Sequence, residues 1–396
     1  MPRRSLLERL LVKDRALPMG ISLLRPSLPP ASALLPYLAR IDQSRRYSNF
    51  GPLALELESR VAHRLGLSPA GVTSLANATV GLTAALLAQQ PAPGSLCLMP
   101  AWTFVATPLA AVAAGLEPYF LDVDPGDWTL RPELCEAALV GLGDRVGAVM
   151  PVSPFGLPAE LAAWERFRDR TGLAVVIDAA AAFDATTAGT VPSVVSLHAT
   201  KALGCGEGGL LFCSDSDLVR RARSFLGFGF LGSRDAQVRG FNGKMSEYHA
   251  AVALAALDVW PATRAALVQR ADHYRAAFAS SNQIRLQPGF GVEWVTATCV
   301  VELPNGTTTA VEAALQAKGT NTCRWWGDGA HRHTATAGLG QGSLPVTDRL
   351  ARSSLGLPFY ADMPMAEIAT VAQQVLAALD RPGPPAAPHQ KDTDIG

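Results

Sequence analysis

Short apolar runs alternate with helical patterns from about residue 55 to residue 260 of the chain. The runs of strand-like length are SLCLMP (95–100), EPYFLDV (117–123), VGAVMPV (146–152), LAVVIDA (173–179), SVVSLHA (193–199) and GLLFCS (209–214). Apolar strands that alternate with helices are typical of a largely parallel sheet with helices on both faces. The pattern therefore predicts a three-layer α/β/α domain with a mostly parallel central sheet.

Apolar residues at helical spacing predict helices over 51–67, 78–90, 158–172 and 246–260. Beyond residue 262 the pattern changes, with helices expected at 263–281, 308–318 and 365–379 and strands near 284–289, 296–303 and 322–326. We therefore expect a large domain over 1–260, including an N-terminal arm, and a smaller C-terminal α+β domain over 261–380. The proline-rich, polar residues 381–396 are predicted to form a disordered tail.

Composition narrows the class of protein. Lys+Arg and Asp+Glu each total 34, so the formal net charge is zero and favours neither nucleic acid nor an anionic membrane as partner. The basic N-terminus lacks the continuous apolar core of a secretory signal, and no apolar stretch has the length of a membrane span. The 6 cysteines are scattered, which predicts reduced thiols in a cytoplasmic enzyme.

Two residues near predicted strand ends carry the most specific chemistry. Asp178 follows a five-residue apolar run, and Lys201 precedes a glycine-rich turn in SLHATKALGCGEGG (196–209). Lysine forms a Schiff base with an aldehyde, and a buried carboxylate keeps a pyridine nitrogen protonated. The pair indicates a pyridoxal-phosphate (PLP) site at the carboxyl ends of the strands, where such sheets bind ligands. The alternative is a helix-capping aspartate and an unrelated surface lysine.

The other parts of a PLP site have candidates as well. Trp102, after a predicted strand, offers a face for the ring, although a core tryptophan is the alternative. Asn77, Ala78 and Thr79 open the predicted helix 78–90, whose free amides favour a phosphate, and Ser196 adds a hydroxyl. Simple N-capping by Asn77 is the alternative there. No cluster has metal-ligand spacing, and the exposed-looking pair HRH (331–333) is a poor metal site.

The motifs taken together resemble one family. They are YSNFGPLALELE (47–58), NATVGL (77–82), PAWTFVAT (100–107), LDVDPGDWTL (121–130), PVSPFGLP (151–158), IDAAAAF (177–183), SLHATKALGCGEGG (196–209) and GFNGKMSEYHAA (240–251). In this order they resemble the PLP-dependent sugar aminotransferases typified by DegT, DnrJ and StrS, within the fold-type-I aspartate aminotransferase superfamily. The resemblance covers residues 47–378.

The resemblance implies a role for each motif. Lys201 is similar to the Schiff-base lysine and Asp178 to the pyridinium partner, while Trp102 matches the stacking aromatic. Ala78, Thr79 and Ser196 match the phosphate cup. Asn242 matches an asparagine that reaches the cofactor of a neighbouring subunit, which implies a homodimer with shared active sites.

The chain also departs from the family pattern. Ala181 stands where glutamine is common, Ser153 and Phe155 replace a common His and Tyr, and Asn77-Ala78-Thr79 replaces Ser-Gly-Thr. A related branch that dehydrates sugars has histidine in place of the lysine, and Lys201 argues against that branch. The departures weaken the transfer of any specific sugar substrate.

The sequence thus predicts a cytoplasmic transaminase that moves an amino group from glutamate to a nucleotide-linked keto sugar, as in surface polysaccharide biosynthesis. Possible substrate contacts are Tyr47, Asn49, Arg324, Trp325 and His331. Arg324 has two equal roles open to it, a bidentate carboxylate ligand or a partner of an acidic surface residue. The rivals are an aminotransferase acting on a cyclitol or free keto sugar, a non-catalytic PLP- or sugar-binding regulator, and a structural protein without ligand.

Overall fold

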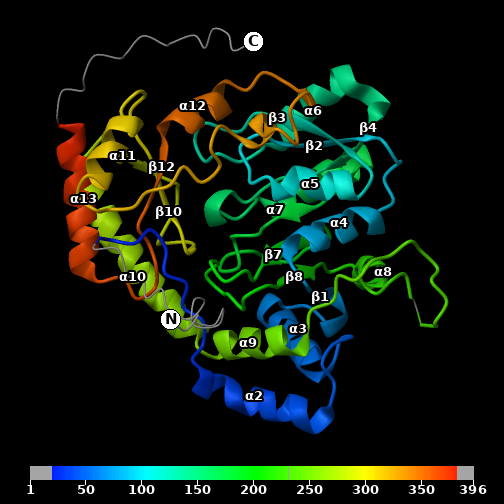
Figure 1. Cartoon of the computed structure of the whole chain (residues 1–396). Helices are drawn as coiled ribbons and strands as arrows, with labels where there is room; N and C mark the ends of the chain where they lie inside the picture. The colour runs from blue at the N-terminus through cyan, green and yellow to red at the C-terminus, as the bar shows by residue number, and fades with distance from the viewer. Residues whose placement is uncertain (1–19, 231, 381–396) are drawn as a thin grey trace, which may run out of the picture.

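The computed structural model describes residues 20–230 and 232–380 (Figure 1). The predicted tail over 381–396 and the first part of the predicted N-terminal arm lie outside the described residues. Within them, a body built on a central sheet lies beside a smaller unit that contains α10, α11 and α13 (Figure 1).

The central sheet consists of two segments. One has five strands, all parallel, in the order β11-β3-β2-β4-β5, and the other has the order β1-β8-β7-β6, in which only β8 runs antiparallel to its neighbours. An isolated parallel bridge between Val152 and Asp178 joins the segments. The strands are β1 (Val72–Leu75), β2 (Leu96–Pro100), β3 (Glu117–Leu121), β4 (Val146–Val149), β5 (Ala174–Val175), β6 (Ile177–Asp178), β7 (Ser193–Ser196), β8 (Gly209–Phe212) and β11 (Gly340–Gln341). The predicted mostly parallel sheet is therefore confirmed.

Helices cover both faces of this sheet, and alternate strand residues divide between the two cores. Leu96 and Leu98 of β2 pack in a cluster with α3 (Pro52–Leu65), α6 (Pro132–Leu142), α7 (Leu161–Thr171) and α9 (Glu247–Asp258). Cys97 and Met99 pack in another cluster with α4 (Ala78–Ala88), α5 (Ala106–Ala113) and α8 (Ser216–Leu226). The three predicted layers are present, and α2 (Ala31–Ser44) packs outside them on α9.

Helix α4 lies very close to the sheet, because Gly81 lacks a side chain. A Cβ atom at this position would come within 2.2 Å of Leu75 and 3.0 Å of Val194. The close packing holds the first turn of α4 at the strand ends, where the predicted site lies.

The smaller unit is built on an antiparallel sheet of order β12-β10-β9, formed by β9 (Arg285–Leu286), β10 (Cys299–Glu302) and β12 (Ser354–Leu357). It shares a core with α10 (Trp260–Phe278), α11 (Thr308–Gln316) and α13 (Met365–Leu379). The predicted strand at 322–326 is wrong: Cys323 makes only an isolated bridge to Gly356, and a turn follows it. The division into domains at residue 261 stays a prediction.

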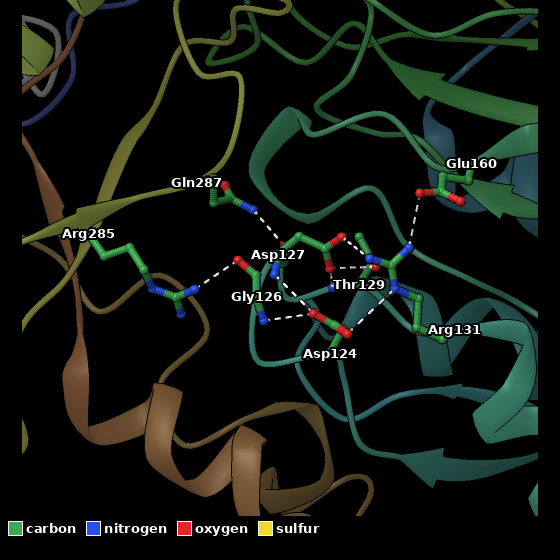
Figure 2. A network of polar contacts seen from close by, with 8 residues as sticks. All are labelled: Asp124, Gly126, Asp127, Thr129, Arg131, Glu160, Arg285 and Gln287. Atoms are coloured by element: carbon green, nitrogen blue, oxygen red, sulfur yellow. Dashed lines mark hydrogen bonds and ion pairs between the residues drawn. The ribbon is translucent and has the colours of Figure 1, made fainter.

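A polar network joins the two units (Figure 2). The Arg285 guanidinium of β9 donates to the carbonyls of Gly126 at 2.8 Å and Pro125 at 2.7 Å, and it also pairs with Glu302. Gln287 donates to the Asp127 carbonyl at 3.2 Å. The loop after β3 is thereby fixed to the small sheet.

Among the described residues, no single helix has both the length and the apolar character needed to cross a bilayer. Helices α9 and α10 reach those criteria only as a pair, and they are bent by 63° relative to each other.

Candidate active site

The carboxyl ends of neighbouring strands bring the predicted residues to one edge of the central sheet. Asp178 ends β6, Ser196 ends β7, and Lys201 lies in the turn beyond β7. Helix α4 begins just after β1, and α5 begins just after β2. The topology therefore gathers residues from four distant parts of the sequence, as a parallel sheet predicts.

Asp178 is a buried carboxylate with two fixed partners. Only 5% of the residue is exposed, its Oδ2 accepts from the Thr107 hydroxyl at 2.8 Å, and its Oδ1 accepts from the Ala180 amide at 3.1 Å. Burial raises the pKa of Asp178, while these two hydrogen bonds and the charge of Lys201 lower it. Thr107 is itself bonded to Thr103 at 2.8 Å, so the carboxylate is held from the α5 side.

Lys201 is positioned by the turn that carries it, because its amide donates to the carbonyl of His198 at 2.8 Å. Burial lowers the pKa of the Lys201 amine, and the negative charge of Asp178 opposes the shift. The two groups are therefore close enough to interact electrostatically. A lysine with a lowered pKa is more often neutral, which is the form that attacks an aldehyde.

The first turn of α4 is suited to bind an anion. Asn77 caps the helix by accepting from the Val80 amide at 3.0 Å, while the amides of Ala78 and Thr79 have no intrahelical acceptor. Ser196 pairs with Gly209 in the sheet, and a Cβ at Gly209 would come within 3.0 Å of the Ala78 nitrogen. The predicted cup residues are thus brought together, and the Asn77 cap leaves the amides of Ala78 and Thr79 free of intrahelical acceptors.

The structure gives Trp102 the role of a core tryptophan. Only 1% of it is exposed, and its ring meets Phe155 and Trp326 edge-on, at centroid distances of 6.4 and 5.3 Å. Phe104, in contrast, is 58% exposed, and its carbonyl accepts from the amide of Thr107, the residue that holds Asp178. Phe104 was not among the site residues predicted from the sequence. Its position just before α5 could have indicated it, but the larger ring of Trp102 favoured that residue as the candidate for stacking.

Some predicted residues lie on the surface of the chain. Asn242 is exposed and accepts from Lys244 Nζ at 2.6 Å. Tyr47 stacks on Tyr248 at 6.3 Å, and Asn49 has a left-handed backbone with φ 63°. No described contact connects these residues with Lys201 or Asp178.

The three C-terminal candidates for substrate contact are engaged in packing or in contacts within the chain. Arg324 donates to Glu312 at 3.2 Å and to Thr309 at 2.9 Å, which is the acidic-partner role of the two that were open. Trp325 packs against Gly356. The expectation that both histidines of HRH are exposed is wrong for His331, which is 5% exposed because it packs under Phe120 and Gly329. Among residues 20–230 and 232–380, no group of three His, Cys, Asp or Glu side chains could hold a metal ion.

The positions that depart from the family pattern border the site. The Ser153 amide donates to the Asp178 carbonyl at 2.9 Å, and Phe155 stacks on Trp326 at 3.9 Å. The Ala181 carbonyl accepts from the Thr296 hydroxyl at 3.3 Å. Aromatic packing thus occupies the turn after β4.

The chain belongs to the DegT/DnrJ/EryC1/StrS aminotransferase family, whose pattern it matches over residues 31–376. The predicted family, fold and PLP-dependent class of enzyme are thereby confirmed. The chain is 31% identical over 342 residues to dTDP-3-amino-3,4,6-trideoxy-alpha-D-glucose transaminase of Streptomyces venezuelae, covering 81% of this chain and 85% of that one. It is 29% identical over 372 residues to protein Rv3402c of Mycobacterium tuberculosis, with 90% of each chain covered.

Solved structures agree with this assignment. The structure of DesI, determined with its TDP-sugar product, has a TM-score of 0.81 at 31% identity and covers 91% of this chain and 93% of its own. An aminotransferase of the same family from Brucella abortus has a TM-score of 0.80 at 26% identity, covering 88% of this chain and 96% of its own.

In the absence of PLP, a variant that lacks both charged groups is expected to be more stable than the wild-type protein. Burial raises the pKa of Asp178, so its ionised form costs stability as the pH rises through that pKa. Burial lowers the pKa of Lys201, so its charged form costs stability as the pH falls through that pKa. Asp178→Asn with Lys201→Met should raise the free energy of unfolding by about 1–3 kcal/mol near neutral pH.

Urea unfolding at several pH values, without PLP, measures this gain. The gain should shrink towards both acid and alkaline pH, where one of the two groups is already neutral. The matched control is Asp217→Asn with Arg220→Met, an exposed ion pair that should change stability by no more than about 0.5 kcal/mol. A double variant that is less stable than wild type at neutral pH would contradict the reading.

Proposed function

We propose that this enzyme transfers the amino group of glutamate to a keto sugar carried on a nucleotide. The observation that carries the proposal is the pairing of Lys201 with Asp178 beside the first turn of α4. It supplies an amine, a carboxylate and an anion site at one sheet edge.

The residues present fit PLP. Bound PLP supplies an aldehyde and an electron-withdrawing ring that stabilises negative charge at the substrate carbon. Asp178 would hold the ring nitrogen, Lys201 the aldehyde carbon, and the amides of Ala78 and Thr79 with the Ser196 hydroxyl the phosphate. The close approach of Gly209 to Ala78 supports this cup, because a side chain there would close it.

The chain's own residues explain how protons are handled. Thr107 and the Ala180 amide both donate to Asp178 and fix the position of its carboxylate. The carboxylate oxygens have further acceptor sites, which are open to a cationic partner such as a protonated ring nitrogen. The lowered pKa of the Lys201 amine makes its neutral form more available near neutral pH, so the amine can take a proton from one atom and return it to a neighbouring one. Asp178 is buried and Lys201 is partly buried, so the protein shields the carboxylate from water more than the amine.

The acceptor class follows from the named relatives. Relatives with 28–32% identity are transaminases of dTDP-linked and UDP-linked sugars. The same chemistry on a cyclitol or a free keto sugar is the nearest rival, and a non-catalytic sensor is the rival of another class. We place the enzyme in the cytoplasm, where nucleotide sugars serve surface polysaccharide biosynthesis.

We assign the ring-stacking role to Phe104 rather than Trp102. Trp102 is only 1% exposed and packs against Phe155 and Trp326, whereas Phe104 keeps an exposed ring beside the helix that holds Asp178.

We further propose a homodimer with shared sites. Asn242 forms a backbone bridge with Gly227, and Phe228 and Phe230, which follow Gly227 closely in the sequence, have exposed aromatic side chains. These exposed rings favour burial of this surface against a second copy. Sedimentation velocity should give the mass of a dimer at micromolar concentration, and a monomer would refute the shared site.

Glutamate turnover tests the proposed function. Purified protein with PLP, glutamate and a panel of nucleotide keto sugars should yield 2-oxoglutarate and an aminated sugar, both detectable by mass. Borohydride reduction followed by peptide mapping should place the cofactor on Lys201, with Lys244 as the unlabelled internal control. Binding of PLP without release of 2-oxoglutarate would support the sensor, and amination of a cyclitol alone would change the acceptor.

Replacing the proposed stacking ring should weaken cofactor binding. Phe104→Ala removes an aromatic contact worth about 1–2 kcal/mol, so the Kd for PLP should rise roughly tenfold, while Phe104→Trp should restore it. The matched control is Val140→Ala, which removes a side chain on a residue that is 91% exposed. Equal PLP affinity in Phe104→Ala and wild type, measured by fluorescence titration, would remove Phe104 from the site.

A further inference from the structure

A cleft opens onto Lys201 at the junction of the two units. Its walls are the N-terminal segment 24–27, the lysine turn 199–202, the start of α10 at Thr263, and the turn 359–361 after β12. Lys201 of the proposed site and the N-terminal segment 24–27 therefore line the same cleft.

The polar lining of this cleft suits a carboxylate. Arg25, Lys201, Thr200, Thr263 and Tyr360 line it, and none of the described lining residues is acidic. The Thr200 hydroxyl is bonded to His198 at 2.9 Å and the Tyr360 hydroxyl donates to Glu367 at 3.0 Å, so the two basic residues are the groups in the lining that attract an anion. A small concave surface with two basic groups and no acid favours a small anion. An arginine can bind a carboxylate through two parallel hydrogen bonds, with a geometry that lysine lacks.

The backbone around Arg25 is fixed before any ligand arrives. Ile21 pairs with the small unit, since its amide donates to the Gly319 carbonyl at 2.9 Å and its carbonyl accepts from Asn321 at 3.0 Å. The Leu23 carbonyl accepts from the Phe359 amide at 3.0 Å. The segment thus runs along the small unit and presents Arg25 at the mouth of the cleft.

The guanidinium is available for a ligand. Its recorded partner is Asp362 at 3.7 Å, with side chains 67% and 51% exposed. An ion pair that is this long and this exposed contributes little to stability. A substrate carboxylate can therefore replace Asp362 at small cost.

We propose that Arg25 binds a carboxylate of the amino-acid donor and so directs the donor's amino group towards Lys201. The inference rests on the proposed aminotransferase function, and it names a specificity-determining residue for the half-reaction with the amino-acid donor. A nucleotide sugar with a neutral ring would not use this contact.

Calorimetry with succinate tests the site without any reaction, because succinate has two carboxylates and no amino group. The purified full-length chain, with PLP present, should bind succinate. Arg25→Gln should weaken the binding about tenfold to a hundredfold, the range for losing a charge-assisted bidentate contact. The affinity of Arg25→Lys for succinate should lie between those of the wild-type protein and Arg25→Gln. Asp362→Asn removes the competing carboxylate and should tighten binding, an effect that a merely structural arginine would not produce.

Single-turnover absorbance of the cofactor tests the donor role. Arg25→Gln should raise the glutamate concentration for half-maximal rate at least tenfold, and it should leave the return half-reaction with a keto sugar unchanged. The control Arg40→Gln removes an arginine of α2 that pairs with Glu56 of α3, and it should alter neither measurement.

The outcomes separate the two hypotheses. Equal succinate binding in Arg25→Gln and wild type would overturn the assignment of Arg25 and leave the aminotransferase function intact. A second outcome combines two observations: Arg25→Gln loses succinate binding, and the wild-type protein never accepts nitrogen from glutamate. That outcome would confirm a carboxylate site and overturn both the donor role and the proposed function.

Discussion

The burial of two opposite charges, on Asp178 and Lys201, is the constraint on which the site depends. The surroundings disfavour the charge of each group, because burial raises the pKa of the acid and lowers the pKa of the amine. Two donors hold the carboxylate, and the negative charge of Asp178 attracts the Lys201 amine. The surrounding fold must therefore be stable enough to tolerate the pair, and the apolar clusters on both faces of the sheet supply that stability.

Much of this architecture could be read from the sequence, because it rests on local periodicity. The strands from β2 to β8 and helices α3, α4, α7, α9 and α13 lie where the apolar pattern predicts them. The short strand β1 was missed because its four residues include Thr73 and Ser74, which are buried only because they pair with β8. Helix α2 contains Pro36, which argues against a helix on local grounds.

The site residues also divide into those that strand topology places and those that depend on long-range packing. Asp178, Lys201, Ser196 and the first turn of α4 were predictable, since strand topology alone places them together. The choice between Trp102 and Phe104 was not, because it depends on which ring the long-range neighbours Phe155 and Trp326 enclose. The burial of His331 had the same origin, as it results from packing against strand β3.

Strand β11 has a consequence for how the molecule folds. Gly340 and Gln341, from late in the chain, pair with Tyr119 and Phe120 and complete the outer side of the parallel sheet. Their partners are more than two hundred residues earlier, so closure of this contact must wait until most of the polypeptide has been synthesised. A fragment that ended after α9 would leave β3 as an uncovered border with free backbone groups, prone to self-association.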